Sequence, residues 1–226
     1  MGVSYPGPKP SVNAKPWGID LPEAKTHIAP MEKQLSPKAA RAFELLKLDS
    51  DEAGKQLDAL PLDEQVGLVL ELPIGPRRQD LILLSSHPEA LARSMPEEDM
   101  VLTIKEIGEE DALPLVELSS NTQLTHLLDL DLWLQQGLDL GRWDEWMGLM
   151  FECGEDRVRR WLKHADFEML VLWAERVAIK LDKEMLNDLP EQLQNRVLSP
   201  DNVHHLAIKV GAELSLVKKL LDLMFQ

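Results

Sequence analysis

The sequence predicts an all-α protein built from short helices, and two features carry this prediction. Leucine dominates the apolar residues, whereas Tyr occurs once and Phe four times, which favours helices over strands. Apolar runs restart at prolines, in Leu60-Pro61, Leu72-Pro73, Met95-Pro96 and Leu189-Pro190. Because proline is tolerated at the first helical position and breaks a helix interior, each site marks one helix end and the next helix start.

The pattern divides the chain into three regions. Residues 1–35 hold six prolines and little periodic apolar sequence, which predicts a flexible N-terminal arm that cannot offset its ordering entropy. For residues 36–136 the pattern predicts a superhelix of short helical repeats. For residues 137–226 it predicts a Trp-containing helical extension packed on the repeats. Ser36-Pro37 starts the first helix, with Ser36 as its N-cap.

Helix starts in the repeat region recur every 23 residues. One series is Leu72-Pro73, Met95-Pro96 and Leu118-Ser119, and His87-Pro88 and Glu110-Asp111 form a second series between them. A unit of two such short helices buries too little apolar surface to fold alone, so it must stack on its neighbours. We therefore expect an α-solenoid of short helical hairpins with longer C-terminal helices. Chance periodicity in a leucine-rich chain is the alternative.

Longer helices follow the repeats. Asn121 is expected to cap a helix that ends near Gly137, and further starts lie near Gly141, Glu155 and Asp166. Four of the six tryptophans fall in 141–181, and we interpret them as core packing, with an aromatic ligand slot as the alternative. Residues 203–210 and 214–225 are expected to form the last helices.

The end of the chain allows two interpretations. Leu220, Leu221, Leu223, Met224 and Phe225 extend an apolar helix surface to the last residues. Either this helix docks on the body of the protein, or the chain is a fragment and a further C-terminal domain covers the surface. In the first case the exposed helix end is also a site for a partner or for self-association.

Charge and composition exclude several classes of function. The formal net charge of −15, without a Lys/Arg stripe, disfavours nucleic acid and anionic lipid surfaces. The sequence has no run of 18 apolar residues, so no transmembrane segment is expected. The single cysteine, Cys153, and the lack of a signal peptide indicate a cytoplasmic protein. We interpret Cys153 as a small buried apolar residue rather than a reactive thiol.

One acidic stretch is a weak Mg²⁺ candidate, since Mg²⁺ needs only one or two carboxylates. Its only basic residue is Lys105, and its candidate ligands are Glu97, Glu98, Asp99, Glu109, Glu110 and Asp111. The alternative is that these side chains occupy first helical turns, where they favour the helix dipole. The sequence contains no Cys/His spacing typical of a zinc site, no nucleotide-binding loop and no motif of a catalytic nucleophile. We therefore expect no enzyme activity and no other cofactor.

Two resemblances add to this picture. Leu60-Pro61-Leu62-Asp63-Glu64 and Met95-Pro96-Glu97-Glu98-Asp99 resemble the intracellular N-terminal helical superhelix of MgtE-type magnesium transporters. That family implies a right-handed superhelix with a regulatory role, but it continues into nucleotide-binding-like modules and a pore that this sequence lacks. Leu127-Leu128-Asp129-Leu130-Asp131-Leu132-Trp133 and Trp143-Asp144-Glu145-Trp146 look more like an uncharacterised bacterial helical-repeat family with an LDLDLW motif.

The sequence thus predicts a protein-protein interaction or regulatory module whose stacked helices form a groove for a partner helix or peptide. A Mg²⁺-responsive regulatory domain, related to the transporter N-domains, is the alternative. An enzyme with a Trp-lined pocket is a third possibility without motif support.

Overall fold

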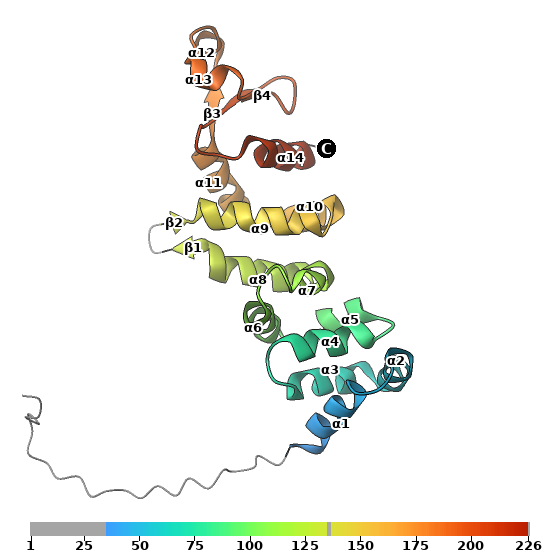
Figure 1. Ribbon diagram of the computed structural model, residues 1–226. Coiled ribbons are helices and arrows are strands. Elements are labelled where there is room, and N and C mark those ends of the chain that lie inside the picture. The colour runs from blue at the N-terminus through green and yellow to red at the C-terminus, as the bar shows by residue number, and fades with distance from the viewer. Residues whose placement is uncertain (1–34, 135–136, 226) are drawn as a thin grey trace, which may run out of the picture. The chain divides into compact units, whose positions relative to one another are not determined.

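The computed structural model describes residues 35–134 and 137–225, which belong to the compact unit Leu35–Gln226. The arm expected over residues 1–35 lies outside the described residues, apart from its last position. Of the described residues, 66% are helical, in fourteen helices, and five short strands accompany them (Figure 1). The protein is therefore mostly helical, as the sequence predicts, with small strands that it does not predict.

The first seven helices are short, and a proline opens or directly precedes five of them. Pro37, Pro76 and Pro88 each open a helix, and Pro61 and Pro96 directly precede one, which confirms the starts expected at Pro37, Pro61, Pro88 and Pro96. The start expected at Leu72-Pro73 is wrong, because α3 ends there and α4 begins three residues later at Pro76, after Gly75. The helices are α1 (Pro37–Leu45), α2 (Ser50–Asp58), α3 (Leu62–Glu71), α4 (Pro76–Leu84), α5 (Pro88–Arg93), α6 (Glu97–Ile107) and α7 (Leu113–Leu118).

These helices pack in a regular order. From α1 to α8 (Asn121–Leu132), each helix contacts the helix two positions further along the chain, and α8 in turn contacts α10 (Glu155–Leu162). At one such contact a Cβ added to Gly54 of α2 would lie 2.6 Å from the carbonyl oxygen of Leu84 in α4. Only glycine allows these two backbones to approach so closely.

The later helices are α9 (Leu140–Glu152), α11 (Phe167–Val177), α12 (Lys183–Asn187), α13 (Glu191–Gln194) and α14 (Leu214–Met224). The expected starts near Gly141, Glu155 and Asp166 are close to those observed. The α8 cap is Ser120, which forms a capping box with Gln123, rather than Asn121. The helix also ends earlier than expected, because a hairpin of β1 (Trp133–Leu134) and β2 (Gly137–Leu138) follows it.

A three-stranded antiparallel sheet replaces part of the expected helical sequence. Its order is β3-β5-β4, with β3 at Ala178–Leu181, β4 at Val197–Leu198 and β5 at His205–Ile208. The expectation of a helix over 203–210 is therefore wrong. The segment pairs along its length with β3, from Leu181↔His205 to Ala178↔Ile208, so tertiary pairing prevails over local helix propensity.

The tryptophans of the C-terminal half lie in the core. Trp143, Trp146, Trp161 and Trp173 are each at most 1% exposed. The Trp143 ring stacks on Trp173 at a centroid distance of 5.7 Å and is tilted against Trp161 at 5.8 Å. These contacts confirm the interpretation as core packing. Among the described residues, no helix combines the length and apolar character required to cross a membrane.

Candidate functional site

The six carboxylates singled out as Mg²⁺ ligands fall into two separate groups. Glu97, Glu98 and Asp99 occupy the first turn of α6, as the sequence predicts. Glu109, Glu110 and Asp111 lie in the turn between α6 and α7, so the expectation that they also occupy a first helical turn is wrong.

Two of these carboxylates are already engaged by basic side chains. Asp99 pairs with Arg78 at 2.8 Å, and Glu109 pairs with Lys105 at 2.9 Å and with Arg142. Within 35–134 and 137–225, no three or more His, Cys, Asp or Glu side chains form a group that could hold a metal ion. The Mg²⁺ hypothesis stays a prediction without a built site.

Asp131 is the centre of an ion-pair network that joins α6, α8 and α9. Its carboxylate accepts hydrogen bonds from Arg142 Nε and from Trp146 Nε1, both at 2.6 Å, and from Lys105. The Glu109 carboxylate also accepts hydrogen bonds from Lys105 and Arg142. The network therefore connects the two segments of the LDLDLW resemblance, with Asp131 from the first and Trp146 from the second.

The electrostatics of this network favour its charged form. Burial by itself raises the pKa of Asp131, but hydrogen bonds from Lys105, Trp146 and Arg142 outweigh burial and hold the pKa below its usual value. The pKa of Glu109 is lowered in the same way, against burial, by Lys105 and Arg142. Lys105 Nζ and Arg142 Cζ also lie 5.6 and 5.3 Å from the centroid of the Trp146 ring. The end of α8 is thus held by polar contacts as well as by the core.

The LDLDLW segment presents different side chains to the core and to solvent. Leu127, Leu128 and Leu132 are at most 1% exposed, and Asp131 points into the network. Asp129 is exposed, and so are Leu130 at 62% and Trp133 at 42%. Asp129 and Asp131 thus diverge, as their spacing on a helix requires.

A second exposed apolar group lies at the start of α11. Phe167 is 78% exposed and directly follows Asp166, which caps the helix by accepting from Glu168 N at 2.7 Å. The pKa of Asp129 is raised, first by burial and then by the nearby charge of Asp166. This interaction places the Asp129 carboxylate within electrostatic range of Asp166 at the start of α11.

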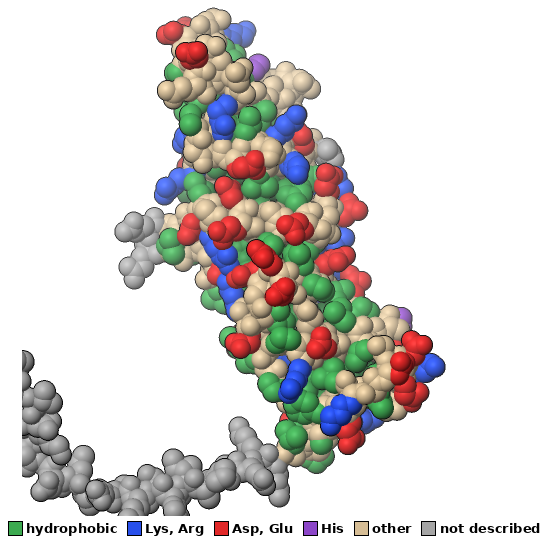
Figure 2. All heavy atoms as spheres, in the orientation of Figure 1, with side chains coloured by type: hydrophobic (Ala, Val, Ile, Leu, Met, Phe, Trp, Pro, Cys, Tyr) green, Lys and Arg blue, Asp and Glu red, His purple; other side chains and the backbone are tan. Residues whose placement is uncertain are grey.

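Together these residues form what we name the α8–α11 surface. Leu134 adds a further exposed apolar side chain, at 59%, and Figure 2 shows hydrophobic side chains at the surface where β1 lies. The surface consists of Asp129, Leu130, Trp133, Leu134, Asp166 and Phe167.

The sequence interpretation missed this surface because it treated the Leu127–Trp133 segment only as a family motif. A signal was present: Leu127, Leu128 and Leu132 can share one helical face, whereas Leu130 then lies on the opposite side.

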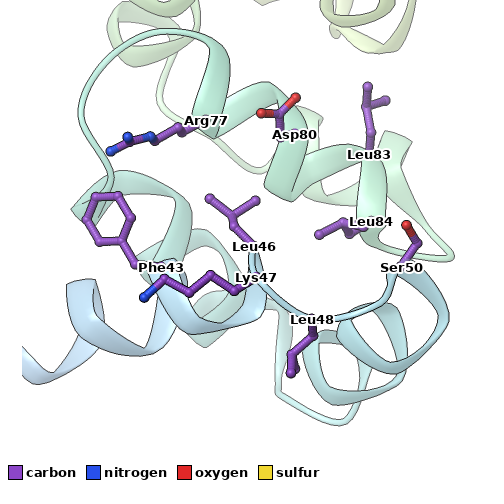
Figure 3. A pocket seen from close by; sticks show the side chains of 9 residues that line it. All are labelled: Phe43, Leu46, Lys47, Leu48, Ser50, Arg77, Asp80, Leu83 and Leu84. Atoms are coloured by element: carbon purple, nitrogen blue, oxygen red, sulfur yellow. The ribbon is translucent and has the colours of Figure 1, made fainter.

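An open hollow of about 540 Å³ lies beside α1, α2 and α4 (Figure 3). On one side the Arg77 guanidinium lies 4.9 Å from the Phe43 ring centroid. Figure 3 shows the charged groups of Lys47 and Asp80 on opposite sides of the hollow. Polar groups do not converge on one point here, so the hollow has no set of groups that would define a ligand.

The described chain is thus a mostly helical protein in which helices stack on their second neighbours and carry one exposed apolar and acidic surface. Residues 54–226 match the family of unknown function DUF6178. Since the match covers more than half of the sequence, the chain belongs to this family. The match supports neither the MgtE-type resemblance nor the LDLDLW family. No curated protein and no solved structure matches the chain significantly.

Proposed function

We propose that this protein is an interaction module that binds a partner protein through the α8–α11 surface. The observation that carries the proposal is the exposure of Leu130 and Phe167, at 62% and 78%, each next in sequence to one of two electrostatically coupled carboxylates, Asp129 and Asp166. Large exposed apolar side chains grouped in one place mark interaction sites, and aromatic residues supply much of the binding energy there.

The charges on this surface indicate the chemistry of the partner. Asp129 and Asp166 are close enough to repel each other, and no ion pair with either of them is found among the described residues. A partner segment with Lys or Arg beside large apolar side chains would relieve this repulsion while covering Leu130 and Phe167. A basic amphipathic helix has these properties.

The helix α8, which carries part of the surface, is anchored on its other sides, and this supports binding. Asp131 anchors the end of α8 to Arg142 and Trp146, and the buried leucines of α8 fix the other side of the helix. Leu130 and Trp133 are thus held in place before a partner arrives, which lowers the entropy lost on binding.

Two further properties belong to the proposal. The contacts between second-neighbour helices support a superhelix of short hairpins, whose stacked units display the surface, and the right hand proposed for it is what the MgtE-type resemblance implies. The single, half-buried Cys153 supports a cytoplasmic location, where disulfides do not form. Within residues 35–134 and 137–225, no metal-ligand group favours the Mg²⁺-responsive alternative.

Site-specific photo-crosslinking tests the proposal. We would replace Phe167 by p-benzoylphenylalanine in the full chain, and Leu102 of α6, which is 51% exposed, in a matched control. The proposal expects a protein adduct from position 167, absent from position 102, at a partner segment rich in Lys or Arg. Identical adducts at the two positions, or none at position 167, would contradict it.

A second set of variants separates apolar from electrostatic recognition. Leu130→Ser and Phe167→Ser should each reduce binding of the crosslinked partner at least tenfold, because each removes a large apolar contact. Asp129→Asn should reduce it less and should weaken its salt dependence. Leu102→Ser is the control, and a loss of binding as large as that of Phe167→Ser would refute the assigned surface.

A further inference from the structure

Strand β3, which runs from α11 toward α12 (Figure 1), forms one edge of the three-stranded sheet. Lys209 N donates to Val177 O at 2.8 Å, one step beyond the register pair Ala178↔Ile208. Since hydrogen-bonded pairs alternate in an antiparallel ladder, the main-chain groups of Ala178 and Lys180 point away from β5.

Three of these outward main-chain groups have no hydrogen-bond partner within 35–134 and 137–225. The Ala178 N–H donates to Ala174 O at the end of α11. The carbonyl groups of Ala178 and Lys180 and the N–H of Lys180 remain. A strand edge with unpaired N–H and C=O groups is a template for pairing with another chain, and an added strand could form three hydrogen bonds here.

An open, mainly apolar hollow lies beside β3 on each face of the sheet. Because side chains alternate between the faces, Ile179 and Leu181 share one face, and Ala178 and Lys180 share the other. The first pair lines a hollow of about 440 Å³ together with α12 and α13. The second pair lines a hollow of about 200 Å³ together with α11 and α14. A strand added at the β3 edge would therefore direct successive side chains alternately toward the two hollows, and apolar residues suit both.

The charges beside this edge are mainly acidic. Glu184 and Asp188 line the larger hollow and Glu175 the smaller one, whereas Lys180 is the one basic residue among the described residues that line them. All four are exposed, and the described part of the chain offers none of them an ion pair. A partner strand with Lys or Arg beside its apolar residues would complement this charge. A second copy of this chain would not, because edge-to-edge pairing brings like charges together.

We propose that the free edge of β3 binds an extended segment of a partner protein, which joins the sheet as a fourth strand. The segment carries three apolar residues in succession, flanked by Lys or Arg. Its main chain bonds to Ala178 and Lys180, and its apolar side chains enter the two hollows. The site is separate from the α8–α11 surface and does not depend on the function proposed for it.

The probe is the peptide acetyl-Lys-Val-Ile-Val-Lys-amide, added to ¹⁵N-lysine-labelled full-length protein. The amide resonance of Lys180, identified by its absence from Lys180→Arg, should show a saturable downfield shift because its N–H gains an acceptor. A peptide N-methylated at two adjacent residues, Val and Ile, loses a main-chain donor in either register and should bind at least tenfold more weakly. No saturable shift at millimolar peptide, or equal affinity of the N-methylated peptide, would overturn the proposal.

Two further measurements test the nature of the partner. The acidic peptide acetyl-Glu-Val-Ile-Val-Glu-amide should bind at least tenfold more weakly at low salt, because it meets Glu184 and Asp188. Equal affinity of the two peptides would refute a basic partner. Sedimentation and hydrogen exchange without peptide test self-pairing: a concentration-dependent dimer that already protects the Lys180 amide would show a second copy on the edge and overturn the proposal.

Variants locate the site independently. Met185→Lys, on the α12 wall of the larger hollow and 44% exposed, should weaken binding of the basic peptide at least tenfold, because a repelling charge replaces an apolar contact. Leu102→Lys in α6, at 51% exposure, makes the same change as a matched control and should not alter binding. Equal losses in the two variants would refute the site. Phe167→Ser should leave peptide binding unchanged, so this proposal and that for the α8–α11 surface fail separately. Melting curves of each variant establish that it folds, and the peptide comparisons on wild type stand without them.

Discussion

Replacing Asp131 by alanine should destabilise the protein by about 3 kcal/mol. Trp146 is fully buried, so its orphaned Nε1–H would carry a desolvation cost of about 2 kcal/mol. Lys105 and Arg142 keep Glu109 as a partner, so the lost charge-assisted bonds add only about 1 kcal/mol. For a chain of this size the sum corresponds to a melting temperature lower by about 6–12 °C.

The assay is urea unfolding monitored by far-UV circular dichroism, with thermal melting as a second measurement. Asp131→Asn should lose about 1 kcal/mol, because the amide oxygen still accepts from Trp146. Asp129→Ala, two residues away and without a hydrogen bond, should change stability by no more than about 0.5 kcal/mol. Equal losses in Asp131→Ala and Asp129→Ala would refute the network as a source of stability.

The same network determines a pH dependence. The folded-state pKa of Asp131 lies below the usual 3.8. As pH falls, Asp131 therefore takes up its proton at a higher pH in the unfolded chain than in the folded chain. The stability that Asp131 contributes is complete well above pH 3.8 and is lost as pH falls through the folded pKa. Wild type should therefore lose more stability than Asp131→Asn on acidification to below pH 3.8. Parallel losses would contradict the ionised pairing.

Three further predictions concern other parts of the molecule. Gly54→Ala should destabilise the protein by about 2 kcal/mol in urea unfolding, because its Cβ would lie 2.6 Å from a backbone oxygen of α4. Gly67→Ala should instead stabilise it by about 0.5–1 kcal/mol, because the nearest atom to the new Cβ is the flexible end of Lys38 at 3.4 Å. Equal effects of the two substitutions would refute the close α2–α4 contact. Burial raises the pKa of Cys153 to about 11, so iodoacetamide at pH 8 should alkylate it at least tenfold more slowly in native protein than in urea, and equal rates would show an accessible thiolate. Mg²⁺ should raise the melting temperature no more than NaCl of equal ionic strength, because no metal-ligand group is found among the described residues; a larger rise with Mg²⁺ would restore the Mg²⁺ hypothesis.

The elements that sequence reasoning predicted well depend on local chemistry. Pro37, Pro88 and Pro96 mark helix starts because the proline ring fixes the backbone and removes a donor wherever it stands. The buried tryptophans were also predictable, since large aromatic side chains at helical spacing find the core by burial alone.

The missed features depend on contacts between distant segments. β3 and β5 are more than twenty residues apart and pair through the backbone, which leaves no signal in either short segment. The link from Asp131 to Trp146 requires α8 and α9 to lie side by side, and neither segment alone indicates it. The exposure of Phe167 follows from the position of α11, which helix periodicity does not specify.

The regular contacts between second-neighbour helices have a consequence for how such a chain can change length. Removing one pair of adjacent helices would leave the remaining helices in the same order of contact between second neighbours. Growth or shortening by pairs would therefore leave the distant α11–α14 end undisturbed. A pulling force applied to the two termini should accordingly open the molecule in successive steps from its ends rather than in a single event.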